Sequence, residues 1–139
     1  MIVLDSNILS ELMRPAPSEA VQRWVAEQPV TNLFTTTITQ AEIFFGLALL
    51  PEGRRRSDLL IAAEQMFAED FADRLLAFDT PAAIEFATIA ATRRRQGRPT
   101  GTFDTQTAAI ALSHGATLAT RNVADFQDCG LTIINPWEA

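Results

Sequence analysis

Short apolar runs alternate with longer amphipathic segments along the whole chain. A run of three or four apolar residues that ends on polar residues is typical of a buried strand, whereas apolar residues three or four apart are typical of a helix. Buried strands separated by helices form a parallel sheet that is covered on both faces. The pattern therefore predicts an α/β fold with a central parallel sheet of four to five short strands and helices on both faces. The expected strands are Ile2–Leu4, Leu33–Thr36, Leu75–Phe78, Thr117–Thr120 and Leu131–Ile134.

Capping and breaking residues divide the segments between these strands into helices. Ser18 can cap a helix whose apolar face carries Trp24, and Thr80 can cap a helix with Pro81 at its first position. The chain shows no repeat, low-complexity stretch or linker, so its length of 139 residues predicts a single domain, residues 1–139. The expected helices are Ile8–Met13, a segment that begins at Ser18, Ile38–Leu50, Arg54–Asp73, Pro81–Gln96 and Asp104–Gly115.

The composition excludes several classes of chemistry. All 11 basic residues are arginine, which excludes sites that depend on a P-loop lysine or a lysine Schiff base. One histidine, His114, and one cysteine, Cys129, cannot build a Cys/His zinc site, and a lone cysteine is consistent with a reducing compartment. The longest apolar run, Ile43–Leu50, is too short to span a bilayer, and no signal-peptide pattern precedes the first strand. We therefore expect a cytoplasmic protein without a membrane segment.

Four acidic residues lie where such a fold would bind a ligand. Asp5 follows the first expected strand, Asp125 comes shortly after the fourth, Asp104 opens the helix before it, and Glu42 lies early in the helix after the second strand. Ligands bind beyond the carboxyl ends of parallel strands, where the strand order reverses. If the first and fourth strands are neighbours there, the three aspartates converge and Glu42 can join them. Close carboxylates raise one another's pKa and are tolerated mainly around a cation such as Mg²⁺ or Mn²⁺, which can activate water for phosphodiester hydrolysis.

Each acid also has a purely structural interpretation. Glu42 stands at capping-box spacing from Thr39, in which case it would only close a helix N-terminus. A second box, Thr37-x-x-Gln40, would leave Glu42 free. The aspartates could serve as helix caps or as turn residues. Spacing alone leaves these alternatives open.

Four stretches resemble the PIN domain, and more narrowly the VapC-type toxins of type II (VapBC) toxin–antitoxin systems. They are MIVLDSNILSEL, TITQAEIFFGL, GRPTGTFDTQTAAIALSHGATLATRNVADF and LTIINPW, which together cover essentially the whole chain. The most specific piece is D-x-x-x-A-x-x-A followed by A-T-L-A-T-R-N-x-x-D-F. The chain departs from the family at Thr100, where an apolar residue is usual, and at Thr102–Phe103, where small or polar residues are common. These departures affect substrate fit near Asp104 and leave the acids untouched.

The resemblance implies a PIN-like fold and a metal-dependent endoribonuclease. Its catalytic metal ligands map onto Asp5, Glu42, Asp104 and Asp125, which would hold one or two Mg²⁺ or Mn²⁺ ions. The resemblance also gives Asn7 and Thr120 the role of orienting the carboxylates or their water. Without it, Asn7 would be a helix cap and Thr120 an ordinary residue at a strand end.

Partners follow from the same resemblance. We expect RNA as substrate, a homodimer, and a small antitoxin whose C-terminal segment lies in a groove of the toxin, so that DNA is reached only through the antitoxin. The groove could use the segment Phe44–Leu50 and the helix around Leu59 to Phe67, although these residues are equally explained as core and dimer interface. The alternative functions are a structure-specific DNA nuclease of the PIN or flap type, and a catalytically silent PIN module that mainly binds a DNA-binding partner.

Arginines are the candidate contacts for RNA phosphates. The runs Arg54–Arg56 and Arg93–Arg95, with Arg98, could follow a phosphate backbone, but runs of charge are usually solvated helix faces. Arg121, next to Thr120, and Arg14, after the first short helix, are better placed for a phosphate contact. The net charge of −6 gives no general attraction for RNA, so metal-free binding should be weak. Trp24 is expected in the core and Trp137 as an anchor for the C-terminus.

Overall fold

Five parallel strands form one sheet in a computed structural model that describes residues 1–139. The strand order is β3-β2-β1-β4-β5, so the predicted parallel sheet is confirmed. β1 (Ile2–Leu4) is central and pairs with β2 (Leu33–Thr36) on one side and β4 (Thr117–Ala119) on the other. β3 (Leu75–Leu76) and β5 (Thr132–Ile134) form the edges. Because the chain leaves β1 toward β2 and later returns to its other side, the strand order reverses between β1 and β4.

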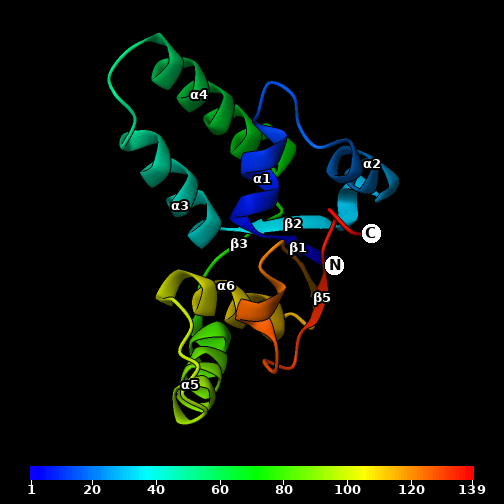
Figure 1. The fold of residues 1–139 in the computed structure, drawn as a ribbon, viewed down its shortest axis with the longest axis vertical. Helices are drawn as coiled ribbons and strands as arrows, with labels where there is room; N and C mark the ends of the chain where they lie inside the picture. The colour runs from blue at the N-terminus through cyan, green and yellow to red at the C-terminus, as the bar shows by residue number, and fades with distance from the viewer.

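Helices cover both faces of the sheet, as predicted (Figure 1). Alternate side chains of β1 point to opposite faces: Ile2 and Leu4 pack with the first four helices, and Val3 packs with the last two. No helix is both long enough and apolar enough to cross a membrane. The first group is α1 (Ser6–Leu12), α2 (Glu19–Glu27), α3 (Thr37–Ala48) and α4 (Arg54–Gln65); the second is α5 (Thr80–Arg95) and α6 (Thr102–Ser113).

Small side chains let α6 lie close to the sheet. Ala108, Ala109 and Ala111 are buried against Leu118 of β4, and α5 packs on the outer side of α6 (Figure 1). On the other face, Trp24 is buried with residues of α1, α3 and α4, which confirms its expected place in the core. His114 caps the C-terminal end of α6 and is exposed, in agreement with its position before Gly115.

The helix predicted over Arg54–Asp73 is shorter than expected. α4 ends at Gln65 and continues as a π-helical turn, Met66–Asp70, whose wider i to i+5 bonding buries both Phe67 and Phe71. Arg74 then donates hydrogen bonds to the carbonyl oxygens of Val30, Leu33 and Asp70. These backbone contacts end the helix, and local periodicity does not encode them.

Four helix starts differ from the prediction by one or two residues, since α1 begins at Ser6 and not at Ile8, α3 begins at Thr37, and α5 and α6 also begin earlier. Asp79, not Thr80, caps α5, and its Oδ1 accepts from the Ala82 N–H at 3.1 Å. α6 begins at Thr102 with Gly101 as its cap, so Asp104 lies in the first turn and does not cap the helix. The side chain of Asp104 is therefore free for another role.

Candidate metal and nucleic-acid site

Asp5 lies at the point where the strand order reverses. Its backbone N–H donates to Ala119 of the neighbouring strand at 3.0 Å, and its side chain caps α1 by accepting from the Ser6 N–H at 2.8 Å. The residue is only 1% exposed. Asp5 is thus a helix cap, one of the two structural roles considered from the sequence, and also a buried carboxylate at the carboxyl edge of the sheet.

Thr120 and Asn7 hold the second oxygen of Asp5. The Thr120 hydroxyl donates to Asp5 Oδ2 at 2.8 Å and accepts from the Asn7 amide at 3.1 Å, and Asn7 Nδ2 also donates to Asp5 Oδ2 at 3.3 Å. The amide oxygen of Asn7 accepts from the Arg121 N–H at 3.2 Å, which ties α1 to the turn after β4. Asn7 is not the helix cap, and both residues make the orienting contacts that the predicted role requires.

Glu42 lies in the second turn of α3, and its side chain takes no part in capping that helix. The cap is Thr36, whose hydroxyl accepts from the Thr39 N–H at 3.0 Å, so neither predicted capping box is used. Glu42 Oε2 accepts from the Ser6 hydroxyl at 3.4 Å, whereas Oε1 is buried without a hydrogen-bond partner. Ser6 is a contact that sequence reasoning missed; its place between Asp5 and Asn7 was the available signal.

The other two acids approach from the opposite side of the sheet. Asp104 is half-buried in the first turn of α6, and Asp125 is exposed on the 3-10 turn Val123–Phe126 after β4. Asp125 is held by its own backbone N–H, which donates to Asn122 at 3.1 Å.

The four carboxylates share one electrostatic field. Burial, and then the charges of Asp5 and Asp104, raise the pKa of Glu42 to about 7. Burial, and then Asp5 and Asp125, raise the pKa of Asp104 to about 6. Burial also raises the pKa of Asp5, against the opposing effect of its three hydrogen-bond donors. The structure therefore brings together the four acids that the sequence singled out.

This donor set suits a hard divalent cation in its chemistry. All four side chains offer carboxylate oxygens, and Glu42 keeps one buried oxygen unpaired. The raised pKa values of Glu42 and Asp104 reflect burial first and then repulsion between the acids, which a cation would relieve. No three His, Cys, Asp or Glu side chains are arranged so that they could hold an ion as they stand. Binding one would require the carboxylates to rotate toward each other.

A groove of about 850 Å³ runs between α1, α3 and α4 and reaches Glu42 and Ser6. Phe44 does not line it, because its ring packs on Phe67 at 5.6 Å between centroids. Phe45 and Leu49 are exposed outside the lining. A groove thus lies where the sequence analysis expected one, but only part of the expected residues line it, and Met13 and Ile43 join them. Its apolar lining includes Met13, Ile43, Leu47, Leu50 and Leu59, and its basic lining consists of Arg14, Arg54 and Arg55.

The candidate phosphate contacts differ in how firmly they are held. The Arg121 guanidinium lies over the Trp137 ring, 4.9 Å from its centroid, beside a hollow of about 440 Å³ that Asp125 also lines. Arg14 is 68% exposed and pairs with Glu11 at 3.5 Å. Trp137 anchors the C-terminus as expected, but its support of Arg121 was not predicted, because no local pattern links the two residues.

Two comparisons with known sequences agree on one family. Residues 2–128 match the family model described as PIN domain. The chain is 41% identical to VapC ribonuclease Y4jK of Sinorhizobium fredii over 99% of both chains, and 36% identical to Toxin FitB of Neisseria gonorrhoeae over 99% of both.

Solved structures show the same fold along the full chain. The crystal structure of FitAcB from Neisseria gonorrhoeae superposes with a TM-score of 0.93 and 35% identity, covering 100% of both chains. The structure of FitAB bound to the IR36 DNA fragment gives a TM-score of 0.91 and 36% identity over 99% of this chain and 96% of that one.

We predict that metal-free protein loses stability as the pH rises from about 4.5 to about 7. The pKa of Glu42 is 4.5 unfolded and about 7 folded, so the folded state binds more protons in this window. Below 4.5 the side chain is neutral in both states and the penalty is absent; above 7 it is fully present. Glu42→Gln should therefore be more stable than wild type at pH 8, by about 1 kcal/mol after allowance for solvent screening.

Thermal unfolding in a metal chelator at pH 4.5 and pH 8 measures this difference. The control is Glu64→Gln, which removes an exposed carboxylate from α4. A stability gain by Glu42→Gln of equal size at both pH values would contradict the prediction.

Proposed function

Because the chain belongs to the PIN domain family, and within it to the VapC-type toxins, we propose that it is a metal-dependent endoribonuclease that acts as the toxin of a toxin–antitoxin pair. The observation that carries this proposal is the convergence of Asp5, Glu42, Asp104 and Asp125 where the strand order reverses. The similarity to VapC ribonuclease Y4jK supports RNA as the substrate. The protein would act in the cytoplasm, where its RNA substrate lies.

The four acids would hold one or two Mg²⁺ or Mn²⁺ ions, which when bound supply a water of lowered pKa and neutralise charge on the scissile phosphate. Asp5 is the fixed member, because Ser6, Asn7 and Thr120 donate hydrogen bonds to it. Glu42 and Asp104 are only half-buried, and they are held by fewer hydrogen bonds than Asp5. Their raised pKa values mean that cation binding near neutral pH releases protons.

Arg121 is the proposed phosphate contact closest to the acids. Its stacking on Trp137 limits the guanidinium's rotation and leaves its planar fork of donors free for phosphate oxygens. Arg14, which lines the groove near Glu42, is the second proposed contact.

Asp104→Asn should abolish cleavage of single-stranded RNA in Mn²⁺ while leaving the fold intact. The side chain makes no hydrogen bond that the substitution would break, so the loss would come from the ligand itself. We expect a fall of at least about 100-fold, since even outer partners of metal ligands typically cost 10–100-fold. Cleavage assays with Asp70→Asn, which neutralises an exposed acid after α4, provide the control.

Matched RNA and DNA strands in the same assay separate the alternatives. Preferential cutting of branched DNA would favour a structure-specific DNA nuclease. Absence of cutting by the wild type, with no Mn²⁺ binding, would favour a catalytically silent binding module. Wild-type-like cleavage by Asp104→Asn and by Asp5→Ala would refute the assignment of the acids.

Arg121→Ala should raise the KM for RNA about ten-fold with little change in kcat, because a charge-assisted hydrogen bond is lost. Trp137→Leu should raise it about three-fold, since a cation–π contact contributes about 0.5–1 kcal/mol. Trp137→Phe keeps a ring under Arg121 and should stay close to wild type. Arg23→Ala, which removes an exposed arginine of α2, is the control for a general loss of positive charge. An equal rise in KM in this variant would argue against a specific contact by Arg121.

The groove between α1, α3 and α4 is the proposed binding site for a cognate antitoxin. Its apolar lining and its junction with Ser6 and Glu42 would let a bound segment cover the acids and inhibit the enzyme. The antitoxin would also provide the link to DNA, as the similarity to FitAB bound to DNA suggests. A homodimer, which the family resemblance implies, belongs to the same proposal, and light scattering would measure it.

Leu59→Glu should prevent co-purification with the proposed cognate antitoxin and should leave RNA cleavage unchanged. A charge placed on the apolar lining opposes docking of an apolar segment, whereas the acids are untouched. Ile84→Glu is the matched control, because Ile84 is an exposed apolar residue on α5 outside the groove. Loss of co-purification with Ile84→Glu, and not with Leu59→Glu, would move the antitoxin site to α5.

A further inference from the structure

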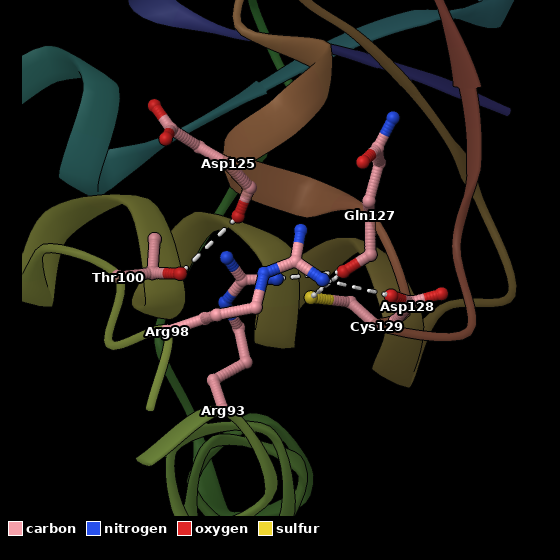
Figure 2. A network of polar contacts seen from close by, with 7 residues as sticks. All are labelled: Arg93, Arg98, Thr100, Asp125, Gln127, Asp128 and Cys129. Carbon is pink, nitrogen blue, oxygen red and sulfur yellow. Dashed lines mark hydrogen bonds and ion pairs between the residues drawn. The ribbon is translucent and has the colours of Figure 1, made fainter. Parts of the chain in front are cut away.

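The end of α5 and the loop before α6 are tied by hydrogen bonds to the turn that carries Asp125 (Figure 2). The Thr100 hydroxyl donates to the backbone carbonyl of Asp125 itself at 3.2 Å. Arg93 Nη1 donates to the carbonyl of Gln127 at 2.7 Å, and Arg98 pairs with Asp128 at 3.4 Å. These contacts lie outside the acid site, and neither the family resemblance nor the proposed function uses them.

Arg93 is an unusual member of a run of charged residues. The sequence favours a solvated face for Arg93–Arg95, and Arg94 and Arg95 are indeed exposed, but Arg93 is only 5% exposed. Its Nε is buried without a partner, so the guanidinium is incompletely compensated for leaving water. Burial of a guanidinium with one unpaired donor costs free energy of folding, so a contribution to stability does not explain why this position carries arginine.

Thr100 connects two of the four acids. It lies in the loop that enters α6, four residues before Asp104, and its hydroxyl bonds the residue that carries the other carboxylate. Figure 2 shows the Asp125 carbonyl facing Thr100 while its carboxylate points away from the network. The backbone of Asp125 is therefore held from one side while its side chain is left free on the other.

Asp125 has little other support of its own. It is exposed, and its turn is anchored by the buried ring of the adjacent Phe126 and by backbone bonding to Asn122. Gln127, whose carbonyl Arg93 binds, begins the extended backbone immediately after the turn. The two hydrogen bonds from Thr100 and Arg93 thus fix the position from which the carboxylate of Asp125 reaches toward Asp5 and Asp104.

We propose that Thr100 and Arg93 are positioning residues that set the separation of Asp125 from Asp104 and thereby the affinity of the acid site for its divalent cation. This inference rests on the proposed function, because it takes Asp125 as a ligand. It also gives a role to Thr100, one of the positions at which the chain departs from the family pattern.

Calorimetric titration of Mn²⁺ into the full-length protein tests the proposal without an activity assay. Thr100→Val removes the hydroxyl and keeps the shape, and it should lower the Mn²⁺ affinity about ten-fold, the lower end for an outer partner of a metal ligand. Thr100→Ser restores the donor and should restore the affinity. Ser113→Ala is the matched control, because it removes a hydroxyl–carbonyl bond of the same kind, 2.8 Å to Ile110, at the far end of α6.

Arg93→Met keeps the apolar stem and removes the charge. If Arg93 positions Asp125, this variant should bind Mn²⁺ about ten-fold more weakly. Its unfolding midpoint should stay near that of wild type, because removing an incompletely compensated buried charge offsets the loss of the hydrogen bond to Gln127. Amide exchange of residues 123–128 in the metal-free protein gives a second readout, and it should accelerate in Thr100→Val and Arg93→Met but not in Ser113→Ala.

The outcomes separate this inference from the proposed function. Wild-type protein that binds no Mn²⁺ would overturn the metal-dependent function, and the exchange measurement would still test the positioning. Wild-type binding with unchanged affinity and exchange in both variants would overturn the positioning role alone. Unchanged Mn²⁺ affinity in Asp125→Ala would overturn the inference through its premise that Asp125 is a ligand.

Discussion

The parallel pairing of β1 with β4 is the contact on which the candidate site depends. Its register places Leu4 opposite Ala119, so the residues that follow each strand, Asp5 and Thr120, meet at the same edge of the sheet. The Thr120 hydroxyl donates a hydrogen bond to the Asp5 carboxylate, although the two residues are 115 positions apart in the sequence. A shift of one residue in this register would turn one of the two side chains to the other face of the sheet and separate it from its partner.

The fold holds these acids together against their mutual repulsion. Burial and like charge raise the pKa values of Asp5, Glu42 and Asp104. The metal-free site therefore lowers the stability of the folded state, and the packing of the surrounding core must compensate for this loss. Donors from Ser6, Asn7 and Thr120 offset it at Asp5, and the Ser6 hydroxyl offsets it in part at Glu42. The net charge of −6 is therefore consistent with a nucleic-acid substrate, because part of it is concentrated where a cation would reverse the local potential.

Polar contacts outside the site hold residues that lie beside the acids, and they come from two different parts of the chain. On one side, Trp137 from the C-terminal segment supports Arg121 next to the acids. On the other, Arg93 and Thr100 connect α5 and the start of α6 to the turn of Asp125. The four carboxylates therefore lie on a strand end, a turn and the first two turns of helices. Asp5 and Asp125 are each held in part by residues from segments distant in the sequence.

The sequence alone determined the parallel sheet and the helices on both faces, and it singled out the four acids as candidates, because burial periodicity and strand-end position are local properties. The tertiary structure decided what depends on contacts between distant segments. It released Glu42 from both capping boxes by making Thr36 the cap, buried Arg93 within an otherwise exposed run, and ended α4 at Gln65. The partners of Arg93 and Arg74 lie in other elements, so no pattern within their own segments records these contacts. The cap of α3 is a local contact, but the local sequence offers several threonines for it.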